Sequence, residues 1–365
     1  MILTVMLSLV FGIILVGYLF LNYYPVFGGK TSKEKFNMFR QSKNFDRNKF
    51  INQIPTVMDT RITTMISILR DLIKGNSNRR PKRAIPVVPL NSAISPDDYT
   101  KATWFGHSTL FLEMEGKRLL LDPMFSQTLS PFSSIGGKRY SKILPIELAN
   151  LPPIDVLILS HDHYDHMDYQ SIKKLKDKVS QFCVPFGVGS HLERWGVDPE
   201  KIRELDWWNE FKLDGLTLVC TPARHFSGRG LSDRDTTLWS SWAIIGKEAK
   251  VYFSGDSGYG PHFATIGEKY GPFDLTFMEC GQYDERWSAI HMMPEETVQA
   301  HIDVKGEILI PIHWSAFTLA LHDWTDPIER VTKAAQERSI AISTPKIGET
   351  VMIGSAEYPN SIWWR

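Results

Sequence analysis

The chain has 365 residues and is 43% hydrophobic, which is enough apolar material for a globular body with a large core. It carries 41 basic and 41 acidic residues, and this balance argues against a nucleic-acid-binding protein, whose domain would be strongly basic. The cysteines, Cys183, Cys220 and Cys280, are widely spaced and form no Cys-x-x-Cys motif. A disulfide framework or a cysteine zinc site is therefore not expected, and we predict buried, free cysteines.

The beginning of the chain is apolar. Residues 2–22 contain no charged side chain, and about twenty apolar positions match the ~30 Å hydrocarbon core of a bilayer. Tyr23 and Tyr24 follow, where interfacial aromatic residues are common. The alternative, a cleaved signal peptide, would need a basic first region, a shorter apolar core and a cleavage site with small residues. Because these are not visible, we predict an uncleaved transmembrane anchor over residues 1–24.

Residues 25–97 are predicted to form a basic juxtamembrane segment. The basic residues of its first part are Lys30, Lys33, Lys35, Arg40, Lys43, Arg47 and Lys49. Glu34 and Asp46 are the acidic residues among them. Since basic residues favour the cytoplasmic side of a membrane, the catalytic domain is predicted to be cytoplasmic, on a single-pass N-terminal anchor.

An amphipathic helix is predicted within this segment, over residues 55–74. Apolar residues recur there in steps of four and three, at Met58, Ile62, Met65, Leu69 and Leu72. This apolar face has two possible fates, packing on the globular body or lying in the membrane interface. Packing is favoured because it is the commoner fate of an apolar stripe. The linker at residues 79–83 is basic enough to touch anionic lipid.

The third predicted region, residues 98–365, alternates short strands with helices. We expect strands at residues 102–105, 109–114, 118–121, 156–159, 182–185, 217–222, 251–254 and 308–312. Helices are expected at residues 168–177, 189–195, 294–304 and 326–338. Glu115 and Gly116 are expected to form a hairpin turn between two of the strands. The pattern predicts an α/β fold with two packed sheets covered by helices.

A histidine-rich segment, Ser160-His161-Asp162-His163-Tyr164-Asp165-His166, directly follows the apolar strand at 156–159. Neutral imidazole and carboxylate are the usual nitrogen and oxygen ligands of zinc. In this spacing His161 and His163 can bind one ion, while Asp165 and His166 turn towards a second. The alternative is a polar surface loop that is rich in histidine. It is disfavoured because further ligand candidates follow other strands.

Those further candidates are His225, Asp256 and His313, each of which comes just after an apolar strand. Because loops at the ends of neighbouring strands meet at one edge of a sheet, we expect these residues near the histidine-rich segment. The predicted ligands of the first ion are His161, His163 and His225, those of the second are Asp165, His166 and His313, and Asp256 bridges the two. A single histidine such as His313 could instead be a core residue, but the repeated arrangement of strand and ligand argues against this.

With these motifs the chain resembles the metallo-β-lactamase superfamily and, within it, the phospholipases D that hydrolyse N-acylphosphatidylethanolamine. The resemblance covers about residues 98–350. Besides the metal motif it rests on the segments 103–109, 151–155, 204–208, 255–259, 271–275 and 312–314. It implies an αββα sandwich with a two-metal site at one edge. The ligand types favour two Zn²⁺, and other divalent metals are the alternative. The N-terminal membrane helix departs from the family pattern and leaves the cell context and the substrate open.

The resemblance also implies that His291 lies beside the metals and helps to handle the substrate, although its sequence context alone fits a helix cap or a surface residue equally. His107 could orient a metal ligand or serve packing. The remaining histidines, His191, His262, His301 and His322, are expected to be structural. The resemblance alone implies a homodimer.

The predicted reaction is zinc-dependent hydrolysis of a phosphodiester in a membrane phospholipid. A metal-bound hydroxide, positioned by Asp165 and Asp256, would attack phosphorus and release phosphatidic acid and an N-acylethanolamine. A serine-hydrolase route lacks its Gly-x-Ser-x-Gly motif. Three alternatives remain: a hydrolase of the same fold acting on a soluble phosphodiester or lactone, a nuclease, and a non-catalytic membrane scaffold that keeps a zinc site.

Overall fold

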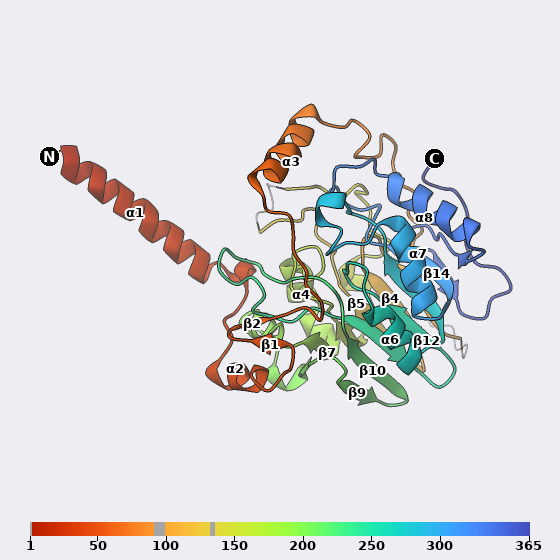
Figure 1. Ribbon diagram of the computed structural model, residues 1–365. Helices are drawn as coiled ribbons and strands as arrows, with labels where there is room; N and C mark the ends of the chain where they lie inside the picture. The colour runs from red at the N-terminus through yellow and green to blue at the C-terminus, as the bar shows by residue number, and fades with distance from the viewer. Residues whose placement is uncertain (1, 91–98, 132–135) are drawn as a thin grey trace.

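Two β-sheets face each other at the centre of the protein (Figure 1). The computed structural model describes residues 2–90, 99–131 and 136–365. Within these residues the strand orders are β16-β3-β4-β5-β6-β7-β8 in one seven-stranded sheet and β15-β14-β13-β12-β11-β10-β9 in the other. A small separate sheet pairs β1 with β2.

The strands of the first large sheet are short, and those in the middle of the sheet are mostly buried. They are β3 (Lys101–Trp104), β4 (Leu110–Met114), β5 (Lys117–Leu121), β6 (Ile154–Ile158), β7 (Val179–Pro185), β8 (Ile202–Leu205) and β16 (Thr350–Met352). Successive side chains point to opposite faces, so Leu110 and Leu112 enter the core between the sheets while Phe111 enters the core outside.

The second large sheet is built in the same way. Its strands are β9 (Glu210–Leu213), β10 (Leu216–Thr221), β11 (Ser241–Ile245), β12 (Lys250–Phe253), β13 (Phe273–Glu279), β14 (Gly306–Ile312) and β15 (Ala341–Ile342). β12, β13 and β14 run parallel, which brings their carboxyl ends to one edge of the sheet.

Helices cover the outer face of each sheet. The first sheet is covered by α4 (Tyr169–Leu175) and α5 (Gly189–Arg194), whose Ile172, Leu175 and Leu192 enter its outer core. The second is covered by α6 (His262–Lys269), α7 (Pro294–Asp303) and α8 (Asp326–Glu337). The predicted αββα sandwich is confirmed.

The expected elements between residues 102 and 338 are present, with ends shifted by at most three residues. The hairpin between β4 and β5 turns at Glu115 and Gly116, and both residues have positive φ, as a two-residue turn of this hand requires. Strands β8, β9, β13, β15 and β16 and helix α6 were not predicted. All three cysteines are free and buried, as expected.

At the N-terminus, α1 (Ile2–Tyr23) projects from the rest of the protein (Figure 1). Its Thr4–Tyr23 portion is long and apolar enough to cross a membrane, and it is the one such helix among the described residues. The elements that follow are η1 (Pro25–Phe27), α2 (Lys33–Phe39), β1 (Phe45–Asp46), β2 (Lys49–Phe50) and α3 (Ile62–Lys74). The predicted domain boundary at residue 98 lies outside the described residues.

The helix predicted over residues 55–74 begins only at Ile62, and backbone and side-chain groups before it are hydrogen-bonded to the sandwich. The Pro55 carbonyl accepts a hydrogen bond from Arg224, and the Thr56 hydroxyl accepts a second one. The expectation that the apolar face of this helix packs on the body is wrong. Met65 and Leu69 are exposed, and Thr64 is the buried residue of α3.

Candidate metal centre

The predicted ligands leave the carboxyl ends of four strands. The histidine-rich segment follows β6, His225 follows β10, Asp256 follows β12, and His313 directly follows β14. Four overlapping groups of potential ligand atoms result, each with its atoms within 4.8 Å of one another. These groups are His161/His163/His225, His107/Asp165/His166/His313, His161/His166/Asp256 and His225/Asp256/His291. The structure thus brings together all seven predicted ligands and the predicted catalytic residue His291.

The first group presents three imidazole rings to a common point. His163 Nδ1 lies 2.8 Å from His161 Nε2 and 3.3 Å from His225 Nε2. Burial lowers the pKa of all three histidines, so their rings are neutral near pH 7. Neutral imidazole is the form that binds a metal ion. The other ring nitrogen of His225 donates to the Ile290 carbonyl at 2.9 Å, which leaves Nε2 free for an ion.

The second group combines histidines with carboxylates. His166 Nε2 lies 3.5 Å from Asp165 Oδ2, and His313 Nε2 lies 4.0 Å from the same oxygen. Both nitrogens are buried, and neither makes a hydrogen bond of good geometry among the described residues, although Asp256 Oδ2 lies 3.1 Å from His166 Nε2. Two such nitrogens beside carboxylates fit a bound cation, because a buried polar atom without a well-placed partner is costly.

Asp256 lies between the two groups, in the position predicted for a bridging ligand. Its Oδ2 is 3.1 Å from His166 Nε2, 3.9 Å from His161 Nε2 and 3.8 Å from His225 Nε2. Burial opposes its ionisation, but the surrounding histidines, His166 first, hold the pKa of its carboxyl well below the usual value. Asp256 is therefore a carboxylate placed where it could contact an ion in either group.

Around His166 the charge balance also calls for a cation. Burial alone would lower the pKa of His166, but the carboxylates of Asp256, Asp165 and Asp122 outweigh burial and raise it well above its usual value. The three carboxylates around His166 would also attract a positive ion. The donor set of this centre therefore fits divalent metal ions of the zinc type.

Three residues orient predicted metal ligands through hydrogen bonds. Asp122 Oδ2 accepts from His166 Nδ1 at 2.7 Å, and the same carboxylate accepts from the backbone and the hydroxyl of Ser160. His107 Nε2 lies 2.9 Å from Asp165 Oδ2, and Ser108 Oγ lies 3.0 Å from His313 Nδ1. Of the two roles left open for His107, the structure thus favours contact with a ligand.

Asp122 was missed by the sequence reasoning, although a signal for it exists. It directly follows β5, just as the histidine-rich segment follows β6, and β5 and β6 are parallel neighbours. The rule that located the other ligands would have found it.

His291 lies against the centre with a carboxylate behind it. Its ring is 5.1 Å from that of His225, and its Nδ1 is 3.4 Å from Glu279 Oε2. Burial raises the pKa of Glu279 to about 7, while His291 opposes this. Burial would lower the pKa of His291, but Glu279 outweighs it and the pKa is raised. Glu279, at the end of β13, was not predicted because β13 was not.

The histidines expected to be structural lie apart from these groups. Their nearest polar partners are the Gly29 backbone N–H for His191, Ser257 for His262, Thr276 for His301 and the Asp323 carbonyl for His322. Among the described residues none of the four belongs to a cluster of potential metal ligands.

The comparisons with known proteins agree with this centre. The family model of the beta-lactamase superfamily domain matches residues 117–314, which include the whole histidine-rich segment, His225, Asp256 and His313. The chain belongs to the metallo-β-lactamase superfamily. The predicted metal ligands therefore lie within the domain that the superfamily shares. The chain is a metal-dependent hydrolase.

Relatives of this chain are found among known sequences, and solved structures share its fold. An uncharacterized protein of Mycobacterium tuberculosis is 42% identical over 332 residues, which are 89% of this chain and 88% of that protein. The N-acyl-phosphatidylethanolamine-hydrolyzing phospholipase D 1 of Caenorhabditis elegans is 34% identical over 273 residues, 70% of this chain and 76% of that protein. A metallo hydrolase of Ignicoccus hospitalis shares the fold, with a TM-score of 0.55 at 23% identity over 70% of this chain and 99% of that structure.

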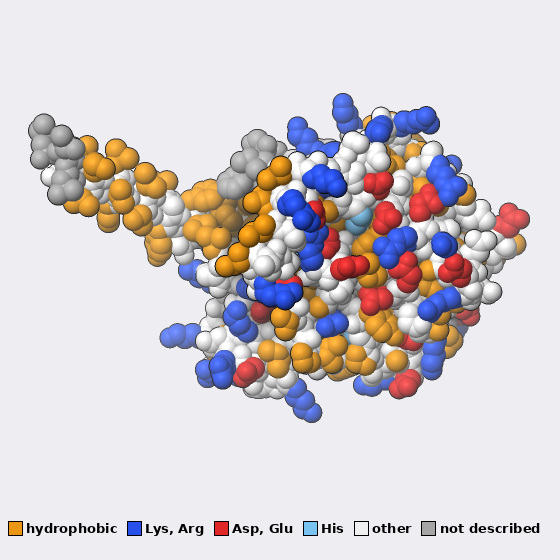
Figure 2. Space-filling model, turned by 45° about the horizontal axis from the view of Figure 1, so that its top comes forward, with side chains coloured by type: hydrophobic (Ala, Val, Ile, Leu, Met, Phe, Trp, Pro, Cys, Tyr) orange, Lys and Arg blue, Asp and Glu red, His pale blue; other side chains and the backbone are white. Residues whose placement is uncertain are grey.

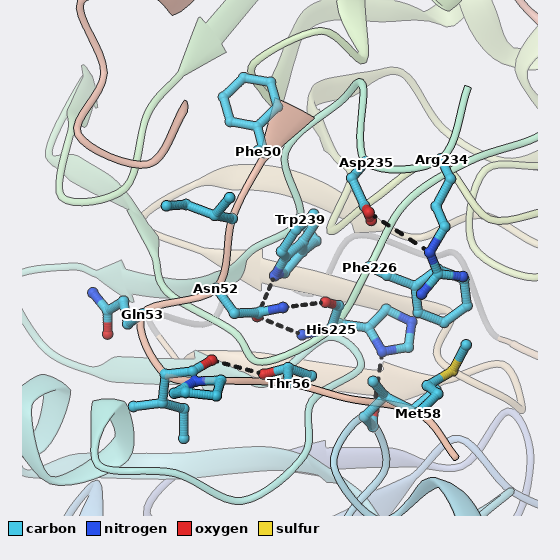
Figure 3. A pocket seen from close by; sticks show the side chains of 14 residues that line it. Phe50, Asn52, Gln53, Thr56, Met58, His225, Phe226, Arg234, Asp235 and Trp239 are labelled. Atoms are coloured by element: carbon cyan, nitrogen blue, oxygen red, sulfur yellow. Dashed lines mark hydrogen bonds and ion pairs between the residues drawn. The ribbon is translucent and has the colours of Figure 1, made fainter. Parts of the chain in front are cut away.

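In this member of the superfamily a pocket of about 430 Å³ adjoins the metal centre (Figure 3). One wall is the segment from Phe50 to Met58, which we call the strap, and the opposite wall includes His225, Phe226 and Trp239. Asn52 of the strap accepts from the His225 backbone N–H and the Trp239 indole, and it donates to the His225 carbonyl at 2.8 Å (Figure 3). The N-terminal part of the chain therefore holds a predicted metal ligand in place.

Proposed function

We propose that this hydrolase cleaves phospholipids of the N-acylphosphatidylethanolamine type into phosphatidic acid and N-acylethanolamine. The observation that carries the proposal is the combination of the two ligand groups, joined at Asp256, with 34% identity to a phospholipase D of this specificity. An apolar N-terminal helix long enough to cross a membrane supports a lipid substrate, since it would hold the centre where lipids are.

Seven residues would hold the metals. His161, His163 and His225 would bind one ion, Asp165, His166 and His313 the other, and Asp256 would contact both. Zinc is the proposed metal because imidazole nitrogens dominate the donor set. When bound, two such ions supply polarisation of a phosphate oxygen and activation of a water molecule.

The remaining steps belong to side chains of this protein. Asp165, held by His107, and Asp256 would orient the attacking water. Its oxygen forms a bond to phosphorus, and the bond between phosphorus and the ethanolamine oxygen breaks. His291 has Nδ1 towards Glu279, so Nε2 is available to give the leaving oxygen its proton. The proton released by the attacking water then protonates His291 again.

The membrane arrangement belongs to the same proposal. α1 would cross the bilayer once, and the basic residues that follow it would keep the catalytic body on the cytoplasmic side. A homodimer and the lack of a nucleic-acid partner remain predictions from the sequence.

The test uses the full chain, purified in detergent, with its metal content measured. It is offered N-acylphosphatidylethanolamine in mixed micelles and, separately, a soluble phosphodiester and a lactone. We expect release of phosphatidic acid that stops with a chelator and returns with zinc. Turnover of the soluble substrates alone would overturn the lipid specificity and keep the metal-dependent hydrolase.

A further inference from the structure

Helix α3 is amphipathic, but its orientation is the reverse of that of a helix that packs on a core. Its polar side faces the body: Thr64 is buried, and Ser67 and Asp71 accept hydrogen bonds from Arg286 at 3.1 and 2.8 Å. These three positions lie on one face of a helix, because they are three and four residues apart. The contact ties α3 to the loop that leads to His291.

The apolar side of α3 faces outwards. Six of its large apolar side chains are between 47% and 78% exposed. They are Ile62, Met65, Ile66, Leu69, Leu72 and Ile73. Such a contiguous apolar surface on a solvent-exposed face indicates a contact with another protein or with a membrane.

The position of α1 decides between these two partners. The carboxyl end of α1 is fixed to the body, since Arg194 donates to the Tyr23 carbonyl and Trp195 donates to the Pro25 carbonyl. α3 lies at the upper left of the body, on the side towards which α1 projects (Figure 1). Hydrophobic side chains also continue along the body beside the base of α1 (Figure 2). A bilayer that contains α1 therefore lies next to α3.

The charges on α3 fit a bilayer surface as well. Arg61, Arg70 and Lys74 are exposed at the borders of the apolar row. An interfacial helix combines an apolar face with basic residues that reach the lipid phosphates. The basic linker at residues 79–83 follows directly and adds to the attraction for anionic lipid.

We propose that α3 lies in the surface of the bilayer that α1 crosses, with its apolar row among the acyl chains and its basic residues at the phosphates. The strap ends at Met58, four residues before α3, so the pocket beside His225 would be held close to the lipid surface. The inference rests on the proposed membrane attachment of α1 and is independent of the reaction.

The test measures the depth of single fluorescent labels in the full chain, reconstituted in nanodiscs that contain phosphatidylserine. The native cysteines are buried, so an introduced surface cysteine can be labelled selectively. Leu69→Cys reports on α3, Val10→Cys on α1, and Lys333→Cys, on the exposed side of α8, is the matched aqueous control. We expect nitroxide-bearing lipids to quench the labels at positions 69 and 10, and aqueous iodide to quench the label at position 333.

Two results would overturn the proposal. In the first, iodide quenches the label at position 69 as strongly as the label at position 333, while the label at position 10 remains in lipid. In the second, the label at position 69 is shielded from both quenchers and the protein has twice its monomer mass, which would assign the apolar row to a second copy. Neither readout depends on turnover, so a failure of the proposed reaction would be seen separately.

Discussion

Asp256 is the residue on which the two halves of the metal centre depend. Its carboxylate lies within 4 Å of ring nitrogens from His161, His166 and His225. In Asp256→Asn the side chain keeps its size and loses its charge. We expect loss of most activity and fewer bound metal ions per chain, measured by turnover and by elemental analysis.

The control for this substitution is Asp177→Asn, an exposed carboxylate just before β7 and away from the centre. It should leave both quantities unchanged. An Asp256→Asn protein with full activity and two metal ions would contradict the assignment of Asp256 as a bridging ligand.

Asp122 acts on the metal through His166. Because its carboxylate accepts from His166 Nδ1, it holds the ring so that Nε2 faces Asp165 and Asp256. Removing such a partner typically weakens metal binding or activity by about 10- to 100-fold. We expect this loss for Asp122→Asn, measured by competition with a chromophoric chelator. Unchanged affinity would show that the contact is dispensable.

Asn52 is a side chain outside the sandwich that supports a predicted ligand inside it. In Asn52→Ala the backbone N–H and carbonyl of His225 lose their hydrogen-bond partner. The Trp239 indole N–H loses its hydrogen bond to Asn52. Unsatisfied groups of this kind cost about 1–3 kcal/mol of unfolding free energy each. We expect a lower denaturation midpoint together with weaker metal binding.

Two further variants make this prediction sharper. Asn52→Asp keeps the acceptor and loses the donor, so its effect should be intermediate. Gln53→Ala changes an exposed neighbour on the same strap and should have little effect. Equal behaviour of the alanine variants at positions 52 and 53 would contradict a positioning role for Asn52.

At the scale of elements, α3 is held to the body by few contacts, and those to Arg286 are central. The Asp71–Arg286 pair, 2.8 Å long, is partly exposed and contributes about 0.2–1 kcal/mol or less. Asp71→Asn should therefore leave global stability almost unchanged but speed amide hydrogen exchange within α3. Exchange in α8 serves as the internal reference. No change in α3 would mean that other contacts hold the helix.

For the whole molecule, metal binding and stability should be coupled. In the part of the chain that the structure describes, the buried ring nitrogens Nε2 of His166 and His313 make no hydrogen bond of good geometry, and a bound ion would relieve this. A ligand that binds the folded state stabilises it by about 2.7 kcal/mol at 100 times its Kd. We expect a chelator to lower Tm and zinc to restore it, measured by calorimetry. Mg²⁺ is the control, because it prefers oxygen ligands and should not restore Tm.

Local patterns in the sequence were sufficient for much of the site. His161, His225 and Asp256 each follow an apolar strand, and parallel strands bring such positions to one edge. The same rule missed Glu279, because β13 follows a proline and its seven residues were not recognised as a strand. Helix α3 shows the opposite failure: its periodicity was clear, but periodicity does not say what the apolar face will contact.

The sequence by itself determined most strands and helices of the sandwich, its two packed sheets and the set of predicted ligands, because each depends on neighbouring residues and regular spacing. The tertiary structure alone decided which residues act from a distance. Asn52 reaches His225 across 173 positions of sequence, and Arg286 reaches Asp71 across 215. Contacts of this range leave no periodic signal, since they form only when the whole chain has folded. The outward orientation of the apolar row of α3 also depends on how the helix is placed on the folded sandwich.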